Sequence, residues 1–241
     1  MNNRILNVPD IMNPESICIF SDASYRTEYN NINGISCPSI CTVHNDKIIN
    51  QEFAIEYGCN SQRGELYALL MAIIEAVRFP GYHIKIFSDN LNGVLALRER
   101  LFRWINLARR DDSDDLDKKN IDVIMNAVYT IIENSIQIEF FHVKGHVNIS
   151  IDNSVAHAKR VFAKSNHIRI GIDSELIKSL SYYNNMVDAY STYNLNRFIE
   201  KYYYKSRLQD AITFDYDKNY NYSNYRELLI LPENRYNKYK K

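Results

Sequence analysis

The sequence predicts an α/β fold in which a mixed β-sheet is flanked by helices. Three strand patterns come first, a strong helical pattern follows, and strands and helices then alternate. Strands joined by tight turns pair antiparallel, whereas strands reached through a helix pair parallel, so this order predicts both kinds of pairing. With 241 residues, 46% hydrophobic and 24% charged, the chain can bury a core. The same composition excludes a wholly disordered chain, a collagen and a disulfide scaffold.

The first strands are expected at residues 16–24, 34–44 and 47–57. The first is a short apolar run that ends in polar residues, as a buried strand does when it reaches a sheet edge. The other two are joined by an Asn-Asp pair, which favours a tight turn and predicts a hairpin. Pro38 has no backbone N–H, so we expect the second strand to lie at an edge or to carry a bulge.

The clearest helical pattern covers residues 61–78, where leucine, isoleucine and valine recur every three or four positions. Ser61 is the expected N-cap, and a Phe-Pro-Gly sequence closes the helix. The remaining elements of this block are a strand at 82–88, helices at 90–104 and 120–133, a strand at 137–143 and a helix at 152–164.

The composition changes near residue 164, which predicts an α/β domain at 1–164 and a mainly helical extension at 165–241. Thirteen of the nineteen tyrosines lie in the extension, whose twelve Lys and Arg residues exceed its nine Asp and Glu residues. Aromatic rings interleaved with cations suit nucleic-acid contact, whereas tyrosines at helical spacing also suit a packed core. The extension is expected to contact nucleic acid or a protein partner.

Charge, cysteines and hydropathy set the expected surroundings of the protein. Lysine and arginine (29) balance aspartate and glutamate (29), so a nucleic-acid partner must be held by local charge. The four cysteines form no C-x-x-C pair and are expected to be reduced thiols. No segment resembles a secretion signal or a membrane span, which predicts a soluble, intracellular, cytoplasmic protein without a membrane partner.

Three carboxylates are expected to meet at one edge of the sheet. Asp22 lies late in the first strand, Glu65 one turn into the first helix, and Asp89 just past the fourth strand. Residues at neighbouring parallel strand ends converge on one crevice. Clustered carboxylates repel unless cations neutralise them, and their oxygens suit Mg²⁺ or Mn²⁺. Two such ions about 4 Å apart serve phosphoryl displacement, so the trio indicates a phosphodiester hydrolase.

Five short motifs, in this order and spacing, resemble type 1 ribonuclease H: FSDAS, SQRGELYA, IFSDN, FHVKGH and DNSVAHA. The resemblance covers about residues 15–164. It implies a five-stranded mixed sheet flanked by helices, and metal-dependent hydrolysis of the RNA strand of an RNA–DNA hybrid. It also implies that Asp22, Glu65 and Asp89 take the first three catalytic positions.

The fourth catalytic position departs from the family pattern. The family has Asn-x-x-x-Asp at the start of the last helix, whereas here Asn153 is followed four residues later by His157. Residues i and i+4 share a helix face, so His157 is expected to bind or border the second metal ion, with Asn153 beside it. Imidazole would favour Mn²⁺ over Mg²⁺. The alternative is that His157 marks a lost ligand in a weakened enzyme.

The resemblance implies further site residues. His146, in the loop after the last strand, is similar to the family's histidine that assists proton transfer or product release, and imidazole exchanges protons near neutral pH. Free N–H groups at the start of a helix, with polar side chains, can read phosphates and 2′-hydroxyls. The expected substrate-binding residues are Ser61, Gln62, Arg63, Asn90, Lys144 and Asn153.

The family's basic protrusion corresponds to residues 98–110, which hold five arginines and Trp104. A run of aspartates follows and offsets their field. We therefore expect the grip on a hybrid to be weaker, or to be shared with the extension.

Together these observations predict a ribonuclease H-like endonuclease that cleaves the RNA strand of RNA–DNA hybrids with two Mg²⁺ or Mn²⁺ ions. One alternative is a hybrid-binding module that has lost turnover and recruits partners through its extension. Another is a nuclease of the same fold that acts on branched DNA, because a fold does not fix the substrate.

Overall fold

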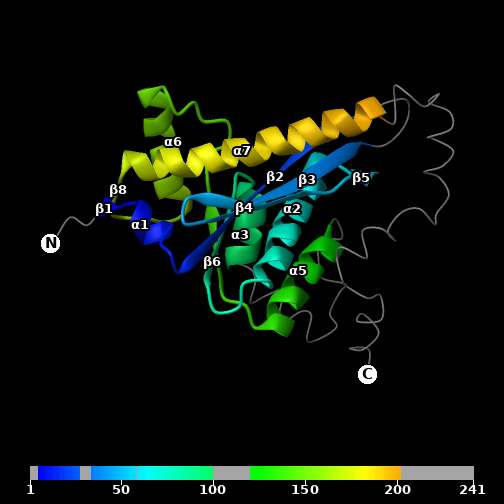
Figure 1. The fold of residues 1–241 in the computed structure, drawn as a ribbon, viewed down its shortest axis with the longest axis horizontal. Coiled ribbons are helices and arrows are strands. Elements are labelled where there is room, and N and C mark those ends of the chain that lie inside the picture. The colour runs from blue at the N-terminus through cyan, green and yellow to red at the C-terminus, as the bar shows by residue number, and fades with distance from the viewer. Residues whose placement is uncertain (1–4, 28–33, 58, 100–119, 202–241) are drawn as a thin grey trace.

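The computed structural model describes residues 5–27, 34–57, 59–99 and 120–201, and Figure 1 shows its fold. The main sheet has the strand order β4-β3-β2-β6-β7, with β5 paired to β3. Its strands are β2 (Ser16–Arg26), β3 (Ile35–His44), β4 (Lys47–Phe53), β5 (Glu56–Tyr57), β6 (His83–Ser88) and β7 (Ile138–His142). The helices are α1 (Val8–Ile11), α2 (Ser61–Ala76), α3 (Leu91–Glu99), α5 (Ile121–Asn134), α6 (Asp152–Ser165) and α7 (Ser174–Ile199). A separate pair is formed by β1 (Ile5–Leu6) and β8 (Gly171–Ile172).

The sheet is mixed, as predicted. β3 pairs antiparallel with β2 and β4, whereas β6 pairs parallel with β2 and β7. The β3–β4 connection is the expected hairpin, because Asn45 and Asp46 have φ of 50° and 57°, the left-handed conformation that a two-residue I′ turn needs. Helix α2 precedes β6, and α3 and α5 separate β6 from β7, so helices provide the crossovers between parallel strands.

Pro38 does not mark a sheet edge, in contrast to the prediction. It lies in β3, which is inside the sheet, and the irregularity of the β3–β4 ladder falls further along the strand. Proline is tolerated because the neighbouring strand is interrupted: β5 pairs with β3 up to Ser36, and β4 pairs with it from Ser39 onward. Pro38 uses its carbonyl there, accepting a hydrogen bond from Ala54 N at 2.8 Å.

Helices cover both faces of the sheet (Figure 1). Neighbouring residues of β2 point to opposite faces, so Ile19 joins a core with α2 and α5, while Phe20 joins a core with α6 and α7. The second core contains a run of stacked rings from Phe20 through Phe87 and Phe141 to Phe162. The central strands β2, β3 and β6 are buried on both sides along most of their length, which agrees with the apolar run at the start of β2.

Helix α7 crosses the sheet over β2 and β3 (Figure 1). Leu176, Leu180 and Val187 on its inner side are almost fully buried in the second core. The expected boundary at residue 164 falls in the last turn of α6, and α6 and α7 belong to one helical layer. Residues 174–199 cover a sheet face that α6 alone does not cover.

Three other predictions concern cysteines, membrane spans and the basic region. The four cysteines are buried and free, and burial raises the pKa of Cys18 to about 12, so this thiol is a core residue of low reactivity. None of the described helices combines the length and apolar character needed to cross a bilayer. The expected basic protrusion beyond Glu99, and the extension beyond residue 201, lie outside the described residues.

Candidate active site

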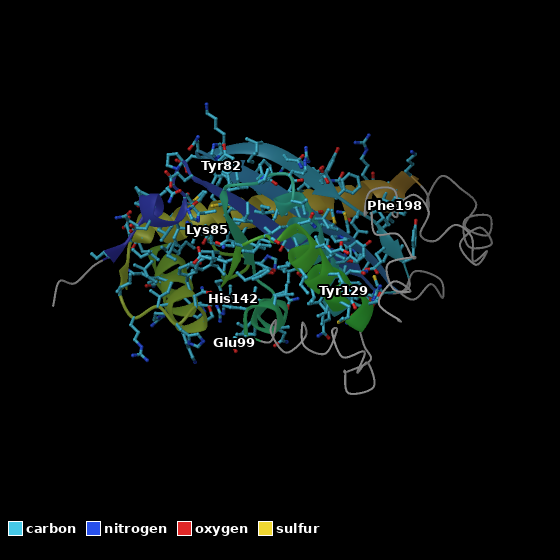
Figure 2. The ribbon with its side chains drawn as sticks, turned by 90° about the horizontal axis from the view of Figure 1, so that it is seen from below. Tyr82, Lys85, Glu99, Tyr129, His142 and Phe198 are labelled. Carbon is cyan, nitrogen blue, oxygen red and sulfur yellow. The ribbon has the colours of Figure 1, made fainter. Side chains whose placement is uncertain are left out.

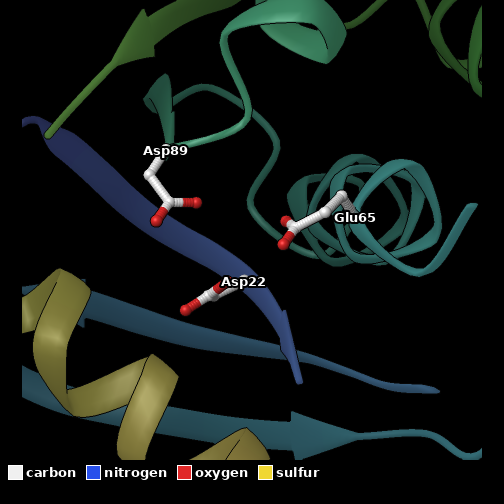
Figure 3. A group of neighbouring side chains, drawn as sticks. All are labelled: Asp22, Glu65 and Asp89. Atoms are coloured by element: carbon white, nitrogen blue, oxygen red, sulfur yellow. The ribbon is translucent and has the colours of Figure 1, made fainter. Parts of the chain in front are cut away.

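Three carboxylates converge where β2 and β6 stop pairing. The two parallel strands are in register up to Ser21 and Ser88, so the next residue of each, Asp22 and Asp89, lies beside the other. Glu65 approaches them from the beginning of α2 (Figure 3). One carboxylate oxygen from each of the three side chains lies within 4.8 Å of those of the other two. Three groups far apart in sequence thus form one carboxylate pocket.

Glu65 reaches the pocket because α2 begins close to β3. A Cβ added at Gly64 would overlap Ser36 Oγ, so this distance between helix and strand requires a glycine. The helix begins after Asn60, whose Oδ1 accepts a hydrogen bond from Arg63 N at 2.8 Å. Asn60 is therefore the N-cap, and the predicted cap Ser61 is the first helical residue.

Asp89 is enclosed by the segment that ends β7 and follows it. A Cβ added at Gly145 would overlap Asp89 Oδ2, so a glycine allows the loop to pass beside this carboxylate. His142, the last residue of β7, places its Nε2 3.2 Å from the carbonyl oxygen of Asp89. The predicted substrate-binding residue Asn90 caps α3, its Oδ1 accepting a hydrogen bond from Gly93 N at 3.0 Å.

The pocket is short of positive charge. Burial raises the pKa of Asp22, Glu65 and Asp89, and repulsion between neighbouring carboxylates raises it further. Asp22 is only 5% exposed, and Glu65 Oε2 is buried without a hydrogen-bond partner among the described residues. Buried oxygen donors that lack a counter-charge fit a hard divalent cation such as Mg²⁺ or Mn²⁺.

A fourth carboxylate, Asp188 on α7, borders the pocket and was not expected from the sequence motifs. Its negative charge raises the pKa of Asp22, Glu65 and Asp89. Its side chain is 31% exposed. Asp188 therefore belongs to the electrostatic environment of the three converging carboxylates, on their solvent-accessible side.

Hydroxyl groups hold α7 beside the pocket. Ser24 Oγ on β2 lies 2.8 Å from Ser191 Oγ and 2.5 Å from Thr192 Oγ1. Ser191 Oγ also donates to the carbonyl oxygen of Asp188 at 2.9 Å. Ser24 lies two residues beyond Asp22 on the same strand, and residues i and i+2 share a sheet face. The hydroxyl contacts therefore fix the position of Asp188 relative to Asp22.

The loop after β7 carries two predicted site residues. His146 is 78% exposed, and its Nδ1 lies 3.2 Å from Asp188 Oδ2. Its φ of 52° is a left-handed conformation that non-glycine residues rarely adopt. Lys144 Nζ donates to the carbonyl oxygen of Gly145 at 3.2 Å, and its charge lowers the pKa of Asp89. Both side chains thus lie beside the carboxylates.

His157 is not among the described side chains whose ligand atoms converge in the carboxylate pocket. It is exposed on α6, on the same exposed side as Asn153. The inner side of α6 consists of Val155, Ala158 and Phe162, which pack into the second core. The i, i+4 relation therefore turns both Asn153 and His157 toward solvent, and the geometry does not support His157 as the fourth metal ligand.

The sequence contains a signal for Asp188. Asn184 precedes it by four residues, which is the Asn-x-x-x-Asp spacing of the family pattern. Asn153 and His157 stand closer to β7 in the chain, where the family's last helix is expected, but they lack the aspartate. In this chain a further helix, α6, separates β7 from α7, where this spacing occurs in the middle of the helix and not at its start.

The predicted substrate-binding residues at the start of α2 differ in their availability. Ser61 and Gln62 are exposed. Arg63 is engaged, because its Nε donates to Glu56 Oε1 at 2.6 Å and its two terminal nitrogens donate to the Asp122 carboxylate at 2.8 and 2.7 Å. Its guanidinium therefore links β5 to α5 and is not free to bind a phosphate.

The fold and site together define an α/β protein with the ribonuclease H fold, a mixed sheet between helical layers with carboxylates at its strand ends. Residues 14–161 match the RNase H family, which is more than half of the sequence. The chain belongs to the ribonuclease H family, whose members are nucleases.

Solved structures with a similar fold include viral and cellular proteins. The prototype foamy virus RNase H domain has 16% identity and a TM-score of 0.44, covering 65% of this chain and 96% of that domain. The foamy viral protease-reverse transcriptase in complex with an RNA/DNA hybrid has 13% identity and a TM-score of 0.48, over 69% of this chain and 21% of that one. LC9-RNase H1, a type 1 RNase H with the type 2 active-site motif, has 13% identity and a TM-score of 0.44, over 62% and 73%. The match spans about a fifth of the length of that protease-reverse transcriptase, and no curated protein sequence matches this chain.

Proposed function

We propose that this protein is a metal-dependent endonuclease that hydrolyses the RNA strand of RNA–DNA hybrids. The observation that carries the proposal is the convergence of Asp22, Glu65 and Asp89 to within 4.8 Å at the edge of a ribonuclease H sheet. Their raised pKa values and the unpartnered oxygen of Glu65 support a site that is completed by cations.

Asp22, Glu65 and Asp89 would hold the cations, and Asp188 takes the fourth position in place of His157. When two divalent ions are bound, they supply an activated water and a stabilised leaving oxygen. An all-carboxylate set offers only hard oxygen ligands, which suit Mg²⁺ as well as Mn²⁺. The preference for Mn²⁺ that a histidine ligand would bring is therefore not expected for this carboxylate set.

His146 is proposed to exchange protons with the reacting groups. Asp188 Oδ2 lies 3.2 Å from its Nδ1, which leaves Nε2 as the ring nitrogen for proton exchange. With 78% of its side chain exposed, the imidazole can meet a substrate at the mouth of the pocket and release the proton to water. Asp188 would then both bind a cation and orient His146.

Recognition of the RNA strand is proposed to involve the start of α2. Ser61 and Gln62 are exposed four and three residues before Glu65, in the first turn of α2. Their hydroxyl and amide groups can hydrogen-bond the 2′-hydroxyl that distinguishes RNA from DNA. Lys144, in the loop beside Asp89, supplies a positive charge for a phosphate.

The deciding experiment measures cleavage of a labelled RNA–DNA hybrid, duplex RNA, duplex DNA and a four-way DNA junction, with Mg²⁺ and with Mn²⁺. We expect hybrid cleavage with either ion, and loss of cleavage in Asp22→Asn and Asp89→Asn. Tight hybrid binding without cleavage under both ions would instead indicate a binding module. Preferential cleavage of the junction would indicate a branched-DNA nuclease, and activity that survives both substitutions would remove these carboxylates from the mechanism.

A further inference from the structure

Helix α6 carries a stripe of exposed polar and basic residues. Its buried side faces the second core, whereas the opposite side is formed by residues at i, i+4, i+7 and i+11. These residues, called the α6 stripe below, are Asn153, His157, Arg160 and Lys164. With a rise of 1.5 Å per residue the stripe is about 16 Å long. The four residues of the α6 stripe belong neither to the second core nor to the carboxylate pocket.

The α6 stripe is a local positive region on a chain whose net charge is zero. Residues 152–170 contain four Lys and Arg residues and two histidines, and Asp152 is their only acidic residue. Within the described part of the chain, Lys159, Arg160, Lys164 and Arg169 form no ion pair. Cations that are not neutralised by neighbouring carboxylates are free to attract an anionic partner.

Two arginines elsewhere on the fold, Arg63 and Arg98, are engaged by other residues. Arg63 is bound by Glu56 and Asp122, and Arg98 donates to Asn166 Oδ1 at 3.0 Å and to a carbonyl oxygen at 2.7 Å. Their guanidinium groups stabilise connections within the fold. The α6 stripe therefore provides unpaired positive charge that these arginines do not.

The C-terminal end of the α6 stripe is fastened next to the carboxylate pocket. Asn166, two residues after Lys164, accepts a hydrogen bond from His142 N at 2.9 Å through its Oδ1. His142 Nε2 in turn lies 3.2 Å from the carbonyl oxygen of Asp89. Figure 2 shows His142 near Glu99 at the end of α3, on the side of the molecule where α6 lies. The C-terminal end of α6, two residues past Lys164, is thus linked to the Asp89 backbone, and the α6 stripe runs from that end along the exposed side of the helix.

We propose that the α6 stripe binds the phosphate backbone of the nucleic-acid duplex whose cleaved strand occupies the carboxylate pocket. The inference rests on the proposed function and extends it, because it assigns the backbone contact to a helix outside the pocket. A B-form duplex carries one negative charge per roughly 1.7 Å, so a 16 Å stripe faces several phosphates at once. Arg160 and Lys164 neutralise phosphates, while Asn153 and His157 donate hydrogen bonds to them.

The test measures binding of the full-length protein to an RNA–DNA hybrid between about 50 and 200 mM salt, in an Asp22→Asn background that prevents cleavage. Arg160→Glu/Lys164→Glu is expected to weaken the low-salt Kd by more than tenfold. Loss of two phosphate contacts should also reduce the slope of log K against log salt by about 1.8, since each contact contributes about 0.9. The neutral variant Arg160→Gln/Lys164→Gln should reduce the slope equally, with a smaller loss of affinity.

A matched control separates the α6 stripe from a general charge effect. Lys47 is an exposed lysine on β4, at the opposite edge of the sheet from β7 and α6. Lys47→Glu makes the same charge change as Lys164→Glu and should leave both Kd and the salt slope unchanged. Because Arg160 and Lys164 are exposed and unpaired, all variants should keep the parent melting temperature.

The outcomes distinguish this inference from the proposed function. If the wild type cleaves the hybrid but both stripe variants keep the Kd and the salt slope of the parent, the inference about the α6 stripe is wrong. The proposed nuclease function then stands. If hybrid binding depends on the α6 stripe but no substrate is cleaved, the phosphate-binding role of the stripe is supported and the proposed nuclease function is wrong. Equal weakening by Lys47→Glu and Lys164→Glu also overturns the inference, because the effect then follows net charge.

Discussion

Helices α6 and α7 offer the same pattern, an asparagine followed four residues later by a candidate ligand, and only α7 directs it to the pocket. On α6 the pair Asn153 and His157 is exposed. On α7 Asn184 is 1% exposed and the charge of Asp188 acts on all three converging carboxylates. Spacing along a helix places two side chains on one face, but packing decides what that face meets.

The inner faces of the two helices differ in polarity. The buried residues of α6 are Val155, Ala158 and Phe162, as in an ordinary amphipathic helix. The buried face of α7 includes Asn184 and Ser191, and Asn184 Oδ1 has no hydrogen-bond partner among the described residues. Burying polar groups is costly without partners, so a polar inner face indicates a helix retained for a site as well as for packing.

The largest expected contrast is between Asp188→Asn and His157→Asn. Asp188→Asn should reduce hybrid cleavage by at least about 100-fold, which corresponds to ~2.7 kcal/mol of transition-state stabilisation. His157→Asn should leave kcat within about twofold, because the side chain is outside the pocket. Single-turnover cleavage at saturating hybrid measures both variants. The reverse ranking would restore His157 as the fourth ligand.

Gly145→Ala should have the next largest effect. The added methyl group overlaps Asp89 Oδ2, so either the carboxylate or the loop with His146 must move. A displacement of about 1 Å at reacting groups costs on the order of 100-fold, and we expect a loss of roughly 10–100-fold in kcat. Ser150→Ala, an exposed substitution in the same loop, is the control. Unchanged activity in Gly145→Ala would show that the pocket tolerates this movement.

The stability of the cation-free protein should depend on pH in a direction set by the pocket. In the unfolded chain, Asp and Glu lose their protons near pH 3.9 and 4.3. Because the pKa values of Asp22, Glu65 and Asp89 are raised in the folded state, these groups keep their protons to higher pH there. The stabilisation that these protons provide is complete below the pKa values of the unfolded state. It is lost as pH rises through the pKa values of the folded state. In EDTA the melting temperature should therefore fall as pH increases from about 5 to about 8.

Two comparisons assign that pH dependence to the carboxylate pocket. Asp22→Asn removes one buried charge, and in EDTA near pH 8 it should melt roughly 2–4 °C above the wild type, the shift that ~1 kcal/mol gives in a domain of this size. Saturating Mg²⁺ should stabilise the wild type more than Asp22→Asn. A melting temperature that rises with pH in EDTA would contradict the electrostatic account of the pocket.

Ser191→Ala should produce the smallest change. It removes the hydroxyl that joins Ser24 to the Asp188 carbonyl, and a buried hydrogen bond of this kind contributes about 1 kcal/mol to stability. Because α7 can then shift relative to β2, the Mg²⁺ concentration for half-maximal activity should increase by roughly 2–5-fold, on the order of 1 kcal/mol of site distortion. Lost stability with an unchanged Mg²⁺ dependence would limit Ser191 to a packing role.

Much of the fold could be predicted because local patterns and tertiary packing agree. The hairpin residues adopt the left-handed turn that their types favour, and the apolar runs form strands buried on both faces. Asp22 and Asp89 could be paired in advance because Asp22 lies late in its strand and Asp89 just past its own, and the two strands are parallel neighbours. Pro38 was misjudged because the interruption between β4 and β5, which makes room for it, has no local signal.

The fourth carboxylate could not be assigned from periodicity alone. Asp188 lies beyond a change in composition that resembles a domain boundary, although α7 packs on the same sheet as the preceding elements. Similarly, Arg63 matches a substrate-binding position by sequence, but its ion pairs involve Asp122, 59 residues away. Contacts between such distant residues are decided by tertiary structure, which a single sequence reveals only indirectly.

The contact between β1 and β8 joins an early segment of the chain to a late one, so it can form only late during synthesis. Ile5 and Leu6 pair with Gly171 and Ile172, immediately before the helix that carries Asp188. Closing a loop this long is entropically unfavourable until both strands exist, so the contact forms late. During synthesis on the ribosome, a nascent chain that already holds Asp22, Glu65 and Asp89 therefore still lacks Asp188 until α7 has emerged.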